Sequence, residues 1–222
     1  MENVIEYKGV TVSQQDATVL TDVTFEVKKG EFLYIIGKVG AGKSSLLKTL
    51  YGELDIRSGE AAVLGYNLRK LRRKDIPPLR RKLGIIFQDF QLLTDRSVHD
   101  NLRFVLRATG WKRSEDIELR IVEALGMVDM TDKADKLPAE LSGGEQQRIV
   151  IARAMLNNPE IILADEPTGN LDAETGRHIV EILHEISKKG TAVIMSTHNL
   201  ALLNEYPARV LQCQDGKLIE TT

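Results

Sequence analysis

The chain has 222 residues, and its 30 basic and 32 acidic side chains leave it close to neutral. Such a balance gives no general attraction to nucleic acid or lipid, so we expect no nucleic-acid partner. The single cysteine, Cys213, cannot form a disulfide within the chain, which favours a reducing compartment. We find no apolar run of the ~18 residues that a membrane span needs and no signal-peptide pattern, since Glu2 and Glu6 occupy the start. These features predict a soluble domain that reaches a membrane only through a partner.

The first third of the chain predicts strands around one short helix. Residues 3–12 and 19–27 are rich in Val, Thr and aromatics and predict two antiparallel strands. Residues 32–36 are wholly apolar, as in a strand buried on both faces, and a helix follows that ends at Gly52. A second buried strand is expected at 84–87.

The rest of the chain predicts a helical block and then alternating helices and strands. Residues 97–136 show a helical pattern that is interrupted at Gly110-Trp111. The elements expected after it are a helix from Ser142 to about Asn157, a strand at 161–165, a helix at 173–188, a strand at 191–197 and a hairpin around Asp215-Gly216. Alternation of this kind favours an α/β class with a mostly parallel sheet. The antiparallel start and the helical block are additions to that sheet.

Residues 69–82 are unusually basic. Eight of these fourteen residues are Lys or Arg, and Pro77-Pro78 interrupts the stretch. We favour a solvated helical face. The alternative is a patch for anionic headgroups or for a loop of a partner.

Residues 37–44 carry the clearest chemical motif. They match G-x-x-x-x-G-K-[ST], the P-loop, in which glycines let backbone N–H groups converge on phosphate oxygens. Lys43 is expected to reach the β- and γ-phosphates, and the Ser44 hydroxyl to bind Mg²⁺. Lys38 and Val39 should face solvent. The predicted nucleotide contacts of this segment are Gly37, Lys38, Val39, Gly40, Ala41, Gly42, Lys43, Ser44 and Ser45.

Polar residues that follow buried strands supply candidates for catalysis. Asp165 and Glu166 end an apolar strand, which beside a P-loop would set Asp165 against Mg²⁺ and let Glu166 orient or deprotonate a water molecule. Gln88 follows another strand and can contact both Mg²⁺ and that water. His198, after the strand at 191–197, is a candidate γ-phosphate contact, although a histidine in such a position is commonly structural.

The stretch LSGGE at 141–145 predicts a second anion site. Ser142 can cap a helix, and Glu145 can close a capping box with it. The free N–H groups of such a helix start attract anions. A second site of this kind lies about a hundred residues after the P-loop.

The order of these motifs closely resembles the nucleotide-binding domains of ABC-type ATPases along essentially the whole chain. The resemblance implies a P-loop NTPase core, with ATP and Mg²⁺ as cofactors, that divides into 1–96 (P-loop core with the antiparallel start), 97–142 (inserted helical signature subdomain) and 143–222 (the remaining core). It also implies a head-to-tail homodimer in which Ser142, Gly143, Gly144 and Glu145 bind the ATP held by the P-loop of the other copy. Residues 170–172, with Asp172 as a nucleotide-site residue, resemble the loop that crosses this interface.

Two segments narrow the resemblance. Residues 84–102 and 163–172 resemble the ATPases that serve lipoprotein release, macrolide-type export and cell division, and residues 76–101 look most like the cell-division ATP-binding proteins. This implies an integral, permease-like membrane partner of the FtsX type and a peripheral location on the cytoplasmic side of the bacterial inner membrane. It also implies activation of septal peptidoglycan hydrolysis. Lipoprotein release or export is the main alternative, and a DNA- or ribosome-associated protein or a non-hydrolysing switch is less favoured.

Two details depart from the family or stay open. The aromatic residue that usually stacks on adenine is missing around residues 13–15, and Tyr7 lies within the predicted strand, so base selectivity is expected to be loose. Phe90, Leu92 and Leu93 follow the catalytic glutamine. They are candidate partner contacts, with packing inside the helical block as the alternative.

Overall fold

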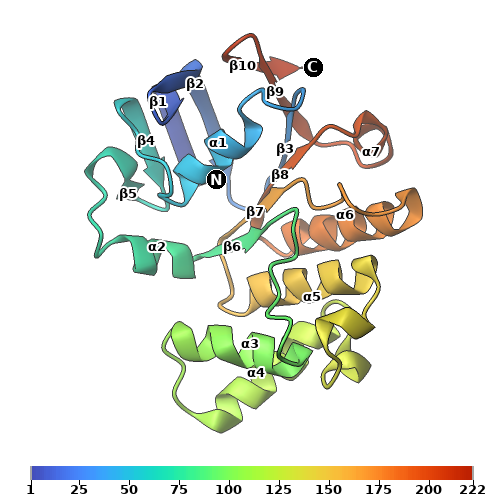
Figure 1. Ribbon diagram of the computed structural model, residues 1–222. Coiled ribbons are helices and arrows are strands. Elements are labelled where there is room, and N and C mark those ends of the chain that lie inside the picture. The colour runs from blue at the N-terminus through green and yellow to red at the C-terminus, as the bar shows by residue number, and fades with distance from the viewer. Residues whose placement is uncertain (1, 222) are drawn as a thin grey trace.

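The computed structural model describes residues 2–221 of the chain and contains two sheets with helices around them (Figure 1). The first sheet is antiparallel and has the strand order β2-β1-β4-β5. Its strands are β1 (Asn3–Gln14), β2 (Ala17–Lys28), β4 (Ser58–Val63) and β5 (Tyr66–Asn67). The prediction of β1 and β2 is confirmed, with both strands slightly longer than expected.

The sequence analysis missed β4 and β5. The segment SGEAAV of β4 is poor in the β-branched and aromatic residues that favour strands. It becomes a strand because it pairs with β1, with Ile5 opposite Val63 and Tyr7 opposite Ala61. Tertiary pairing thus overrides a weak local preference.

The second sheet has the order β10-β9-β3-β8-β7-β6. Its strands are β3 (Phe32–Ile36), β6 (Leu83–Ile86), β7 (Ile161–Asp165), β8 (Ala192–Thr197), β9 (Arg209–Gln214) and β10 (Lys217–Thr221). All neighbours pair in parallel except the hairpin of β9 and β10, so the predicted α/β class and the closing hairpin are confirmed. Parallel pairing brings the carboxyl ends of β3, β7 and β8 to one edge.

Seven α-helices lie within residues 2–221, with three short 3₁₀ turns at Leu68–Lys70 (η1), Thr131–Lys133 (η2) and Pro138–Glu140 (η3). The α-helices are α1 (Lys43–Leu50), α2 (Ile76–Arg81), α3 (Val98–Ala108), α4 (Ser114–Gly126), α5 (Gly143–Met155), α6 (Ala173–Lys188) and α7 (Leu200–Glu205). The predicted interruption at Gly110 separates α3 from α4. Pro77 and Pro78 open α2 instead of ending a helix, because the first turn of a helix needs no N–H from them.

The buried core has one cluster on each face of the six-stranded sheet. Alternate residues of β3 belong to opposite clusters: Leu33 and Ile35 to the one with the antiparallel sheet and α1, and Tyr34 and Ile36 to the one with α3, α4, α5 and α6, where the Tyr34 hydroxyl lies 3.2 Å from Nε2 of His184. This confirms that β3 is buried on both faces. Figure 1 shows α3 and α4, which fall within the predicted helical block of residues 97–142, gathered below the sheet together with α5.

Of the described helices, none combines the length and the hydropathy that crossing a bilayer requires.

Candidate active site

The loop between β3 and α1 is shaped by glycines. A Cβ atom at Gly37 would lie 2.7 Å from the carbonyl oxygen of Cys213, and one at Gly42 would lie 2.6 Å from Cγ1 of Val19. Gly42 also has φ near +100°, which L-residues rarely adopt. Lys38 and Val39 face solvent as expected, with Val39 91% exposed. The close approach of the loop to β2 and β9 therefore requires glycine.

Lys43 is the first residue of α1, and its ammonium group turns back over the loop. The side chain is buried, and Nζ donates to the carbonyl oxygens of Gly37 at 2.9 Å and Lys38 at 3.4 Å. Nζ also lies 3.1 Å from Oε1 of Glu166. The N-cap, Gly42, has no side chain, so no side-chain cap competes for the first N–H groups of α1. A buried cation and an uncapped helix start suit the phosphate groups of a nucleotide.

Asp165, at the end of β7, joins the P-loop to β8. Its Oδ1 accepts hydrogen bonds from the Ser44 hydroxyl at 3.0 Å and from the Ser196 hydroxyl at 2.6 Å. The hydroxyl and carboxylate oxygens of Ser44 and Asp165 match the ligands that Mg²⁺ prefers. The sequence analysis overlooked Ser196, which is fully buried; the signal was a polar end, Ser-Thr, on an otherwise apolar strand.

Glu166 is held by contacts on both of its carboxylate oxygens. Oε1 pairs with Lys43, and Oε2 lies 2.6 Å from Nδ1 of His198. Its backbone has φ near +49°, and its N–H donates to the hydroxyl and carbonyl oxygens of Ser196 at 2.9 and 3.2 Å. The Glu166 carboxylate is thus held by Lys43 and by His198, on a strained backbone. In this position it could orient or deprotonate an attacking water. The structure thus brings together four predicted residues: Lys43, Asp165, Glu166 and His198.

Gln88 and Ser45 lie at the border of this cluster. The side chain of Gln88 packs against Gly169, and its carbonyl oxygen accepts from Nδ2 of Asn170 at 3.3 Å, so it adjoins the loop that follows Glu166. The Ser45 hydroxyl donates to Oε1 of Gln14 at 3.1 Å. A nucleotide contact of Ser45 would therefore come from its main chain.

The predicted capping box at the start of α5 is confirmed. The Ser142 hydroxyl accepts from the Glu145 N–H at 3.3 Å, and the Glu145 carboxylate accepts from the Ser142 N–H at 2.8 Å. This backbone hydrogen bond, together with Lys133 at 3.1 Å, lowers the pKa of Glu145 to about 2. A Cβ at Gly144 would lie 2.4 Å from Cγ2 of Thr175, so glycine lets α5 approach α6. The nucleotide contact of Glu145 stays a prediction.

The start of α5 is separate from the P-loop of the same chain. Within residues 2–221, no hydrogen bond or ion pair links residues 142–145 to residues 37–45. Gly143 lies instead beside Leu171 and Phe90. Asp172 caps α6 by accepting from the N–H groups of Glu174 at 3.1 Å and Thr175 at 2.9 Å, so its side chain fixes the loop before that helix.

The β1–β2 turn provides no aromatic ring near the P-loop. Tyr7 is 1% exposed and its hydroxyl lies 2.8 Å from Oγ1 of Thr49, inside the core. Gln14, through its bond to Ser45, places a polar turn beside α1. A nucleotide base at this turn would meet amide and hydroxyl groups.

The family of the chain follows from comparison with known proteins. The model of the family described as ABC transporter matches residues 20–169. The chain belongs to this family. It is therefore an ATP-binding protein and an ATPase of the ABC type, with an α/β fold whose helical insertion and antiparallel start were expected from the sequence.

Similar proteins share nearly the whole length of the chain. It is 41% identical to the cell division ATP-binding protein FtsE of Streptococcus pneumoniae, over 98% of this chain and 94% of that protein. It is 43% identical to FtsE of Mycobacterium tuberculosis over 90% and 86%, and 42% identical to FtsE of Escherichia coli over 90% and 89%. These three relatives are cell-division ATP-binding proteins.

Solved structures agree with this assignment. The dimeric ATP-binding cassette MJ0796, bound to ADP and Pi, is 31% identical and has a TM-score of 0.86, with 98% of both chains covered. The protein cbiO1 from Clostridium perfringens, part of the ABC transporter complex cbiONQ, is 29% identical and has a TM-score of 0.90, over 99% of this chain and 88% of that one.

Proposed function

We propose that this chain is the ATP-hydrolysing subunit of a membrane complex in bacterial cell division. The observation that carries the proposal is the similarity to three FtsE proteins at 41–43% identity over at least 90% of this chain. In this role ATP hydrolysis drives an integral, FtsX-like partner, and the motion passes through the membrane to activate septal peptidoglycan hydrolysis. The chain itself sits peripherally on the cytoplasmic side of the inner membrane.

We assign the roles of the site residues from the P-loop motif and from the contacts described above. Residues 37–45 cradle the phosphates, with Lys43 as the cation. Ser44, Asp165 and Gln88 would hold Mg²⁺, which would neutralise phosphate charge. Glu166 orients the attacking water and accepts its proton, and His198, 2.6 Å from Glu166, contacts the γ-phosphate.

We assign the second half of the nucleotide site to another copy of this chain. The start of α5 has no hydrogen bond or ion pair to its own P-loop among the described residues. Its Gly143 lies beside Leu171, in the loop that ends at Asp172, and its Gly144 lies beside Thr175 of α6. In a head-to-tail homodimer each ATP lies between the P-loop of one copy and residues 142–145 of the other. Two dimeric structures of the cassette MJ0796 support a homodimer for this chain.

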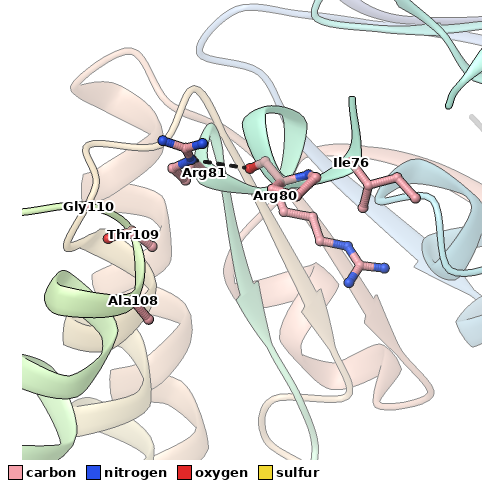
Figure 2. A pocket seen from close by; sticks show the side chains of 7 residues that line it. Ile76, Arg80, Arg81, Ala108, Thr109 and Gly110 are labelled. Atoms are coloured by element: carbon pink, nitrogen blue, oxygen red, sulfur yellow. Dashed lines mark hydrogen bonds between the residues drawn. The ribbon is translucent and has the colours of Figure 1, made fainter. Parts of the chain in front are cut away.

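One groove of the molecule is a candidate docking site for the membrane partner. A groove of about 490 Å³ lies between α2 and the end of α3 (Figure 2). It is lined by Ile76, Pro77, Arg80, Arg81 and residues 108–110. We propose that a cytoplasmic helix of the membrane partner docks here.

The three predicted partner contacts differ in their surroundings. Phe90 and Leu92 are partly buried against the core of the helical block, as the alternative interpretation expected. Leu93 stays 37% exposed and remains a candidate contact.

The experiment that tests the cell-division role is a crosslinked pull-down from native membranes, with mass spectrometry of the integral proteins recovered. Recovery of an FtsX-like protein together with septal hydrolase factors is the expected result. A lipoprotein-release or export permease in its place would overturn the cell-division role and leave the ATPase assignment intact.

A further inference from the structure

A dense band of positive charge crosses the segment between β5 and β6. We call it the basic strip: Arg69, Lys70, Arg72, Arg73, Lys74, Arg80, Arg81 and Lys82. All eight side chains are exposed, and Asp75 is the one acidic residue within residues 69–82. The rest of the chain has 22 basic and 31 acidic residues, so the strip is positively charged whereas the remainder of the chain has a net negative charge.

The basic strip is not the single solvated helical face that the sequence analysis favoured. α2 covers Ile76–Arg81, and the residues before it lie on η1 and on an irregular loop. The usual reason for charge on an amphipathic helix, a solvated face opposite the core, therefore applies to Arg80 and Arg81 alone.

Most of this charge is not neutralised within the part of the chain that the structure describes. Arg72 pairs with Asp75 at 2.9 Å and Lys82 pairs with Glu160 at 3.1 Å. Within residues 2–221, no carboxylate oxygen lies within 4.0 Å of the cationic nitrogens of the other six. Arg69 donates to the carbonyl oxygen of Gly59 at 3.2 Å and Arg80 to that of Tyr51 at 3.0 Å, and these bonds hold the side chains in place without removing their charge.

The backbone beneath the strip is anchored to the core. Leu68 and Leu79 are buried in the cluster that includes α1 and the antiparallel sheet, and Leu71 packs against Gly52. The backbone that carries the cations is thus fixed, and it has little order to gain when an anionic partner binds.

We propose that the basic strip rests on the anionic phosphate headgroups of a membrane leaflet. None of its eight cations is buried and they are spread over fourteen residues, which suits a surface of many mobile anions better than a single bound phosphate. Arg80 and Arg81 also line the groove of Figure 2, so the strip continues from the place assigned to the membrane partner. This positional argument rests on the proposed function, whereas the charge argument does not.

The test measures binding of the full chain to vesicles without any other protein. The wild type should sediment with phosphatidylcholine vesicles that contain about one third phosphatidylglycerol, and not with phosphatidylcholine alone. Raising the salt from about 0.1 to about 1 M should release it, because the Debye length falls from about 10 to about 3 Å. The double variant R73E/K74E should bind at least ~10-fold more weakly.

A matched control is available at Lys28 and Lys29. They are an exposed pair of basic residues at the end of β2, outside the strip, and K28E/K29E makes the same change in net charge. This control should bind anionic vesicles nearly as well as the wild type. Both double variants should keep wild-type ATPase activity in solution, since none of the four side chains touches the active-site cluster.

Three outcomes would overturn the lipid proposal. The first is that the wild type binds neutral and anionic vesicles equally well. The second is that K28E/K29E loses as much binding to anionic vesicles as R73E/K74E does. The third is that the wild type does not bind vesicles, while R73E/K74E, and not K28E/K29E, fails to recover the membrane partner in a pull-down. The last result would assign the strip to an acidic protein loop. A wild type without ATPase activity would instead count against the proposed function, whatever the vesicles show.

Discussion

Glu166 combines a left-handed backbone, an ion pair with Lys43 and a contact with His198. The backbone conformation costs free energy, since φ near +49° is unfavourable for a residue with a Cβ atom. Two hydrogen bonds from its N–H to Ser196 hold the strained backbone. The arrangement fixes one carboxylate at the phosphate end of the P-loop.

Replacing Glu166 by Gln is expected to lower kcat at least ~100-fold, because an amide cannot accept the proton of the attacking water. Nucleotide affinity should stay within about threefold of the wild type, since Lys43 and the P-loop backbone remain. Steady-state phosphate release and equilibrium binding of a fluorescent nucleotide measure the two quantities.

The matched control is Glu160→Gln, at the other end of β7, where the carboxylate pairs with the exposed Lys82. It should change kcat little. A Glu166→Gln protein that hydrolyses ATP at the wild-type rate would remove the proposed base.

The capping box of Ser142 and Glu145 orders the start of helix α5. Ser142 and Glu145 satisfy each other's backbone N–H groups, and Gly143 and Gly144 let the helix start lie close to Leu171 and Thr175. The start of the helix is thus fixed in direction while its Ser142 side chain stays exposed. An ordered, exposed helix start suits contact with a second molecule.

The capping box should make part of the stability depend on pH. The ordinary pKa of Glu145, 4.5, falls to about 2 in the fold, mainly because of the Ser142 N–H. A lowered folded-state pKa means that the carboxylate stabilises the fold above pH ~4.5 and that this contribution is lost as the pH falls towards ~2. Glu145→Gln should cost about 1 kcal/mol at pH 7, and less as the pH drops through this range.

Urea unfolding of wild type and Glu145→Gln at pH 7, 5, 4 and 3 measures this difference. Glu115→Gln serves as the control because that carboxylate is 84% exposed and pairs with the exposed Arg113. A difference between wild type and Glu145→Gln that stayed constant from pH 7 to pH 3 would contradict the capping account.

The P-loop and the second half-site that we propose at residues 142–145 lie in different parts of the molecule. The P-loop lies at the edge where β3, β7 and β8 end, whereas residues 142–145 begin α5 in the helical part of Figure 1. A single chain folded in this way cannot enclose a nucleotide with both. Symmetric pairing of two copies is the simplest closure, since each copy then supplies what the other needs.

Mixing two inactive variants tests this pairing. Ser142→Arg should abolish hydrolysis by damaging the half-site at residues 142–145, and it should leave nucleotide binding at the P-loop nearly intact. Lys43→Ala should damage only the half-site at the P-loop. An equal mixture should recover about a quarter of wild-type ATPase activity, because half of random dimers would be mixed and each would hold one intact site.

The controls are each variant alone at the same total concentration, which should remain inactive. A mixture no more active than these controls would mean that the nucleotide is handled within one chain. Weak nucleotide binding by the Ser142→Arg monomer would contradict the division of labour between the two halves.

Local patterns were sufficient for several parts of the fold and the site. The apolar run 32–36, the glycines of the P-loop and the pair Ser142–Glu145 depend on residues close in sequence, so the strand, the loop and the cap could be predicted from the sequence alone. β4, β5 and α7 could not, because short elements with weak propensity form through contacts with distant segments. Ser196 belongs with them, since its role depends on the register that puts it beside Asp165.

The sequence by itself thus determined the motifs, the family resemblance and the order of the main strands and helices. Only the tertiary structure decided that Lys43, Asp165, Glu166 and His198 form one cluster, that Tyr7 is buried and that six basic side chains of residues 69–82 lack a carboxylate partner in the described part of the chain. The physical reason is that pairing across a parallel sheet and burial join residues far apart in sequence, and no local pattern records those distances.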